Sequence, residues 1–130
     1  MKRKKKNLKK KLHFFIQKKK DLFIFLSSFI VPDLKIFCKY PDYQEEFDGE
    51  YDLEKLDSLF LIFDLPLLVT GKNIILEASE EELYLKNGKI YEAIIRFPIK
   101  VDPKSYSSIF DLEARQLKFE IRVNLVYYNF

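Results

Sequence analysis

Short apolar runs separated by turn residues recur every eight to twelve residues from residue 58 onward, and this spacing limits the fold more than any other feature. The most regular run, residues 117–123, alternates strictly between apolar and charged side chains, as a strand with one buried face does. No segment of crossover-helix length separates the runs, which favours an antiparallel sandwich over a parallel α/β sheet. The predicted strands cover residues 58–64, 73–77, 82–86, 90–97, 106–111 and 117–123.

Turn residues indicate where several of these runs end. Asn87-Gly88 is the strongest hairpin signal in the chain, and Pro66 follows an apolar run that it cannot continue. Residues 40–50 are acidic and contain one proline and one glycine, so we interpret them as a surface connector rather than a core strand.

Two further segments, residues 34–40 and 125–130, are candidate edge or self-capping strands because no clear hairpin bounds them. With them, the chain is predicted to be all-β: an antiparallel β-sandwich of seven or eight strands over residues 34–127, in a domain of residues 34–130.

The N-terminal part has the periodicity of an amphipathic helix instead. From residue 8 to residue 30, apolar side chains recur at alternating steps of four and three, and lysines occupy the opposite face. Pro32 cannot continue a helix and disfavours helical backbone angles at Val31, so the predicted helix covers residues 8–31 within an arm of residues 1–33. The candidate partner-binding stripe consists of Leu8, Leu12, Phe15, Leu22, Phe23, Leu26 and Phe29.

Charge is divided unevenly between the arm and the rest. Residues 1–20 carry eleven Lys/Arg and no acid, whereas the remaining 110 residues carry twelve Lys/Arg and twenty Asp/Glu, a net charge of −8. Such a segment can pack on the sandwich or on a second copy, bind RNA or the ribosome through residues 2–20, or lie on an anionic membrane surface, and the sequence leaves these alternatives open. The candidate phosphate- or anion-binding residues are Lys2, Arg3, Lys4, Lys5, Lys6, Lys9, Lys10 and Lys11.

The single cysteine, Cys38, excludes a fold built on internal disulfides and favours a reducing, cytoplasmic compartment. We expect it to be a small buried hydrophobe in an edge strand. The apolar run 22–31 follows basic residues, as in a signal peptide, but it is too short to span a bilayer and no small-residue cleavage site follows it.

Groups suited to catalysis are scarce. His13 is the only histidine and lies in the basic helix, 25 residues from Cys38, so the two suggest neither a nucleophile pair nor a metal set. The acidic clusters in residues 45–52 and 77–82 lack the spacing of a calcium loop and are interpreted as solvated faces, or as a docking surface for a basic partner or the chain's own arm. We therefore predict no enzymatic activity, no catalytic or metal site and no cofactor.

A set of apolar and proline motifs runs through residues 58–123. It consists of Phe63-Asp64-Leu65-Pro66, Ile74-Ile75-Leu76, Leu83-Tyr84-Leu85, Tyr91, Phe97-Pro98, Val101-Asp102, Ser108, Phe110-Asp111 and the strand from Leu117 to Val123. In these motifs the chain resembles the sandwich shared by small heat-shock proteins, the α-crystallin domain, and the CS domain of co-chaperones, including the C-terminal domain of the PIH family. Small heat-shock proteins usually carry Asn-Gly and one further residue before the last core strand, where this chain has Ala114-Arg115-Gln116, and the CS side of the family fits better.

This resemblance implies a chaperone-like or co-chaperone adaptor that binds a protein client or a chaperone and catalyses nothing. A partner would add a strand to a sheet edge or contact the apolar helix stripe, which could also form a homodimer. The alternative is a nucleic-acid- or ribosome-associated protein that uses its basic arm. The identity of the partner, the oligomeric state and the docking of the helix stay open.

Overall fold

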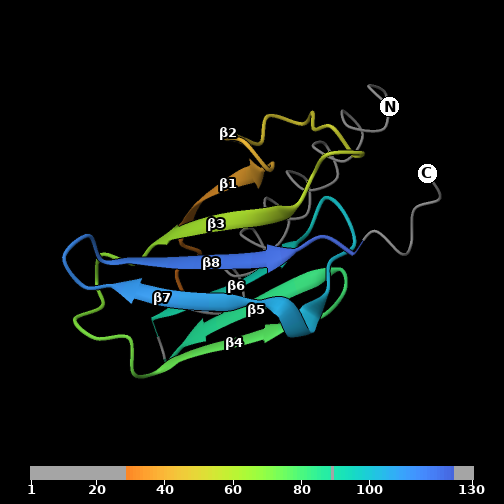
Figure 1. Cartoon of the computed structure of the whole chain (residues 1–130). Helices are drawn as coiled ribbons and strands as arrows, with labels where there is room; N and C mark the ends of the chain where they lie inside the picture. Colours follow the sequence, from red (N-terminus) through yellow and green to blue (C-terminus); the bar gives the residue numbers. More distant parts are fainter. Residues whose placement is uncertain (1–28, 89, 125–130) are drawn as a thin grey trace.

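The computed structural model describes residues 29–88 and 90–124, which form two antiparallel sheets packed face to face (Figure 1). The larger sheet has five strands in the order β2-β1-β3-β8-β7, and the smaller has three in the order β4-β5-β6. The elements are β1 (Asp33–Lys39), β2 (Gln44–Glu46), β3 (Ser58–Asp64), β4 (Ile74–Ala78), β5 (Glu82–Asn87), β6 (Tyr91–Arg96), the 3-10 turn η1 (Pro103–Ser105), β7 (Ser107–Asp111) and β8 (Gln116–Arg122).

Alternation along the strands sets the register of the larger sheet. In the β3–β8 pair, Leu61 lies opposite Phe119. Two residues along the strands in each direction, a further apolar pair lies on the same face of the sheet. All these side chains face inward and are buried. Because the side-chain period of a strand is two, a slip by one residue would expose the whole set, so burial fixes the register.

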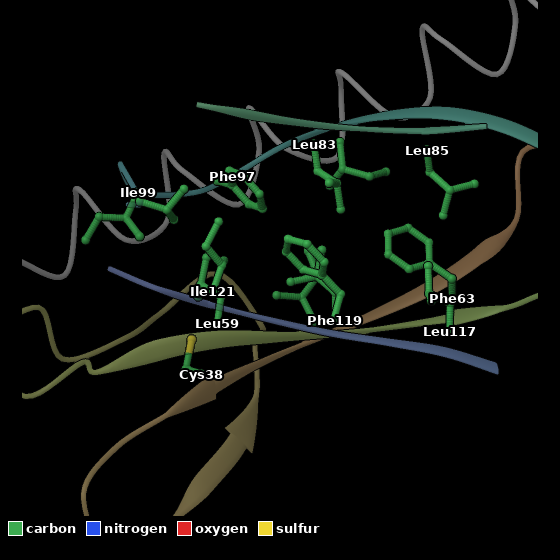
Figure 2. Close-up of a cluster of buried hydrophobic side chains, with 14 of the residues drawn as sticks. Cys38, Leu59, Phe63, Leu83, Leu85, Phe97, Ile99, Leu117, Phe119 and Ile121 are labelled. Atoms are coloured by element: carbon green, nitrogen blue, oxygen red, sulfur yellow. The ribbon is translucent and has the colours of Figure 1, made fainter. Parts of the chain in front are cut away.

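The core lies between the two sheets. Figure 2 shows Leu83, Leu85 and Phe97 facing Phe63 and Phe119 across the gap. Burying a Leu or Phe of this kind contributes roughly 1.5–3 kcal/mol relative to leaving it in water. Among the described residues, every buried side-chain nitrogen or oxygen has a hydrogen-bond partner.

A buried tyrosine, Tyr91, ties the small sheet to the loop that follows β3. The residue is 2% exposed, and its hydroxyl accepts a hydrogen bond from the backbone N–H of Leu67 at 3.2 Å. The loop therefore has a fixed position against the core, although several of its own side chains are exposed.

Two turns contain residues in the left-handed backbone region. Gly88 has a φ of +47°, and the N–H of Ile90 donates to the carbonyl of Asn87 at 3.0 Å, which closes the predicted Asn87-Gly88 turn. Arg115, in the turn between β7 and β8, has a φ of +53°, which costs a non-glycine residue about 1–2 kcal/mol.

The structure confirms the all-β sandwich and each of the six predicted strands to within two residues. It corrects the prediction that residues 34–40 are an edge strand, because β1 pairs with β3 along its length and with β2 over Phe37–Lys39. β2 itself lies inside the segment predicted to be a connector. Residues 125–130 lie outside the described part of the chain.

The predicted helix is wrong at its C-terminal end. Ile30 forms a parallel β-bridge with Tyr91, and Val31 is not helical. Pro32 explains this, because it pushes the backbone before it toward extended angles. The rest of the predicted helix, residues 8–28, lies outside the described residues, as do His13 and the candidate anion-binding residues.

Candidate protein-interaction surfaces

Two strands at one side of the sandwich have a free edge. Within the described residues, β7 ends the larger sheet and β4 ends the smaller one, and each pairs with a single neighbour. Figure 1 shows both at the lower side of the molecule. A free edge presents a row of unpaired backbone N–H and C=O groups, so it can accept a further strand.

The segment leading into β4 packs directly against β7. A side chain at residue 71 would place its Cβ 2.9 Å from the Cβ of Phe110, so only glycine permits this approach. The loop of residues 65–73, which runs from β3 to β4, therefore packs against β7 and holds the two free edges close together.

Large apolar side chains are exposed along these edges and this loop. We call them the apolar rim, and each is between 50% and 71% exposed. Ile75 lies on the outer face of the small sheet and Ile109 on that of the large sheet, so apolar side chains accompany each of the two free edges, as they do at interaction sites. The apolar rim consists of Leu67, Val69, Ile75, Ile109 and Leu112.

Hydrogen bonds hold the turn between β7 and β8 against the same loop. The Arg115 guanidinium donates to the carbonyl of Pro66 at 2.9 Å, and the Arg115 carbonyl accepts from the N–H of Leu65 at the same distance. Asp111 accepts from the N–H of Ala114 and pairs with Lys118 at 3.2 Å. These two donors lower the pKa of Asp111, so the carboxylate at the end of β7 is ionised at neutral pH.

On the outer face of the larger sheet, several charged and polar side chains form hydrogen bonds with one another. Lys39 and Ser58 both donate to the carboxylate of Glu120, at 3.0 and 3.1 Å, and the Lys39 ammonium lies 5.9 Å from the ring centroid of Phe60. The adjoining ring of Phe37 is 6.1 Å from that of Phe60. These contacts pair the polar groups of Lys39, Ser58 and Glu120 with one another.

The sequence-derived candidates have mixed outcomes. Cys38 is fully buried, as predicted, but β1 is not an edge strand. Of the helix stripe, the structure describes Phe29, whose ring centroid is 5.3 Å from the Lys86 ammonium. In the described ranges, no three His, Cys, Asp or Glu residues are arranged to hold a metal ion.

Sequence reasoning missed the apolar rim, although two signals pointed to it. In the run Ile74-Ile75-Leu76, adjacent residues must face opposite sides of a strand, so Ile75 had to point away from the core. The same argument separates Ile109 from Phe110. Both strands were predicted, but their position at a free edge depends on the topology of the sheets.

No helix within the described residues is long and apolar enough to cross a membrane. A search among curated proteins finds no sequence relative. Among solved structures, the chain is similar to heat shock protein 16.0 from Schizosaccharomyces pombe, with a TM-score of 0.55, 9% sequence identity, and coverage of 84% of this chain and 83% of that one. At this identity the likeness shows the fold alone, a sandwich of the α-crystallin type.

A family model covers the whole sandwich with both of its free edges. It describes a PIH1 CS-like domain and matches residues 32–124, from the residue before β1 to the residue that follows the isolated bridge at Val123. The match includes every strand on which the likeness to CS domains rests. The chain belongs to the PIH1 CS-like domain family.

Proposed function

We propose that this chain is a co-chaperone adaptor that binds an extended segment of a client or chaperone along the apolar rim. The observation that carries the proposal is that two free strand edges and five exposed large apolar side chains occur together at one side of the sandwich. The backbone of β4 or β7 supplies hydrogen bonds to an added strand, and the apolar rim contacts its alternate side chains.

The proposal assigns no catalytic step to the chain. The fold and the family support a binding module, and the buried thiol of Cys38 suits a reducing, cytoplasmic compartment. The alternative, nucleic-acid binding by the basic arm, depends on residues outside the described part and stays a prediction.

The test measures binding of fluorescent extended peptides with apolar residues at alternate positions. We expect the double variant Ile75→Lys, Ile109→Lys to weaken binding by at least about tenfold, or ~1.4 kcal/mol, because it places two charges where apolar side chains would be buried. NMR amide shifts on peptide addition should concentrate in β4 and β7.

The matched control is Gln44→Lys, Glu46→Gln, which makes the same net-charge change of +2 on the exposed edge strand β2 at the far side of the larger sheet. It should leave peptide affinity unchanged. Equal affinities for the wild type and the double variant, with both folded, would contradict the proposal.

A further inference from the structure

A second surface, which shares only Ile75 with the apolar rim, is the outer face of β4–β5–β6. Since Leu83 and Leu85 point into the core, their neighbours on β5 point outward. The residues of β4 and β6 that pair with these outward neighbours lie on the same outer face. The central outward residues are Tyr84, Lys86, Glu92 and Ile94.

The described chain begins against this face. The N–H of Ile30 donates to the carbonyl of Ile90 at 2.7 Å, and the carbonyl of Ile30 accepts from the N–H of Glu92 at 3.0 Å. This pair of bonds holds Ile30 at the outer edge of β6. Immediately before it, Phe29 contacts the outward-facing Lys86 of β5, so the chain that precedes residue 29 starts from the outer face of the small sheet.

The face combines the apolar groups of Tyr84 and Ile94 with charged side chains, of which the acids Glu77, Glu82 and Glu92 outnumber the bases Lys86 and Arg96. A hollow of about 330 Å³ lies against Tyr84 and Ile94 and is bordered by Glu77 and Glu82. The hydroxyl of Tyr84 donates to Glu92 at 2.6 Å, and this bond raises the pKa of Tyr84 to about 12, so the phenol stays neutral beside the carboxylate. Such a surface suits a segment that has both apolar and basic side chains.

The sequence immediately before Phe29 has that composition. In a helix, Leu22, Leu26 and Phe29 share one face at steps of four and three. Lys18 to Lys20 lie one helical turn before Leu22. Strands of six residues span about 20 Å, and a helix covers that length with about 13 residues. The segment from residue 8 to residue 28 is therefore long enough to cross the face without a second molecule.

We propose that residues 8–28 dock as an amphipathic helix on the outer face of β4–β5–β6 of the same chain. Leu22 and Leu26 cover the hollow beside Tyr84 and Ile94, and the lysines face Glu77 and Glu82. Continuity with Phe29 and Ile30, charge complementarity and the length of the segment favour the chain's own segment over a separate partner.

The experiment is cysteine cross-linking in the full chain with a short bismaleimide. The test variant is Leu26→Cys, Ile94→Cys, and the matched control is Leu26→Cys, Ile109→Cys, in which the second cysteine lies on β7 of the other sheet. Cys38 is buried, and single-cysteine additions correct for any reaction with it.

We expect an intramolecular cross-link between residues 26 and 94 in the monomer, identified by mass spectrometry of the linked peptides, at least about tenfold above the 26–109 control. Equal linkage in the two variants, or none in either, would overturn the proposal. A 26–94 link found only in covalent dimers would also overturn it, because the segment would then dock on a second copy. None of these results depends on peptide binding at the apolar rim.

A double-mutant cycle gives a second readout. If residues 26 and 94 are in contact, Leu26→Asp and Ile94→Asp should each lower the Tm by several degrees, and their combination should lower it by less than the sum. Additive shifts would contradict direct contact. Leu26→Asp combined with Ile109→Asp is the control and should be additive.

Discussion

The two sides of the larger sheet end in free strands of opposite character. β2 has three residues, Gln44, Glu45 and Glu46, all polar and all exposed, and it covers only part of β1. β7 has five residues with Ile109 at its exposed centre, and the similarly free β4 lies at the same side. Natural sheets protect their edges with short strands and charge, so β2 is a protected edge, whereas β7 and β4 are left suitable for pairing.

This difference shows that edge position alone does not create a binding surface. Among the described residues all three strands are free on one side, but β2 itself carries only polar side chains, whereas β4 and β7 each carry an exposed isoleucine, Ile75 and Ile109. Glu45 and Glu46 would have to lose water on pairing with a further strand, and that cost opposes association. Ile75 and Ile109 would gain from the same event.

The largest expected effect comes from removing the core residue on which β7 depends. Phe119 is fully buried opposite Ser108 of β7, and its ring stacks on Tyr106 at 5.2 Å and on Phe97 at 6.5 Å. Phe119→Ala should lower the free energy of unfolding by about 3–5 kcal/mol because it leaves a cavity. Urea denaturation measures this loss.

Phe60→Ala is the matched control, since Phe60 lies on the outer face of the same sheet and is only half-buried. Its cost should be clearly smaller. If the two substitutions lower the free energy of unfolding equally, packing of β7 on the buried core would contribute no more stability than packing on the outer face. The stability of the β7 edge would then not depend on the core, contrary to the comparison of the two edges.

Converting the protected edge into an apolar one should change association next. Glu45→Ile with Glu46→Ile gives β2 a more apolar edge than β7 has and removes two negative charges. We expect concentration-dependent self-association by analytical ultracentrifugation, through pairing of β2 edges. Glu45→Gln with Glu46→Gln removes the same charge without adding apolar surface and should stay at the wild-type state. Association of the Gln variant would show that charge repulsion alone protects this edge.

Local patterns predicted most of the strands, and long-range pairing decided the rest. Residues 117–123 were placed to within a residue because alternation is a property of the strand itself. β2 left no such signal: its residues are all polar, and it forms because the chain turns back beside Phe37–Lys39 of β1. A strand that exists only through its neighbour cannot be found from its own periodicity.

The binding surface was missed for a related reason. The sequence drew attention to the basic arm, whose pattern is long and regular, whereas the apolar rim consists of residues from two strands, a loop and a turn. Leu67 and Ile109 are 42 positions apart, and their common side follows from the sheet order and from the contact of Gly71 with Phe110. Neither fact can be read from a single segment.

The smallest expected effect concerns the turn that holds β7 against the loop. Arg115→Gly relieves the left-handed strain at φ +53° and loses the exposed bond to Pro66, so the free energy of unfolding should rise by a net ~0.5–1 kcal/mol. Arg115→Ala keeps the strain, loses the bond and should be slightly destabilised, which separates the two contributions in chemical denaturation. If the Gly variant is less stable than the Ala variant, the side-chain bond to Pro66 outweighs backbone strain. The loop would then be fixed to β7 mainly by that bond, and the close approach of the two apolar edges would depend on Arg115 as well as on Gly71.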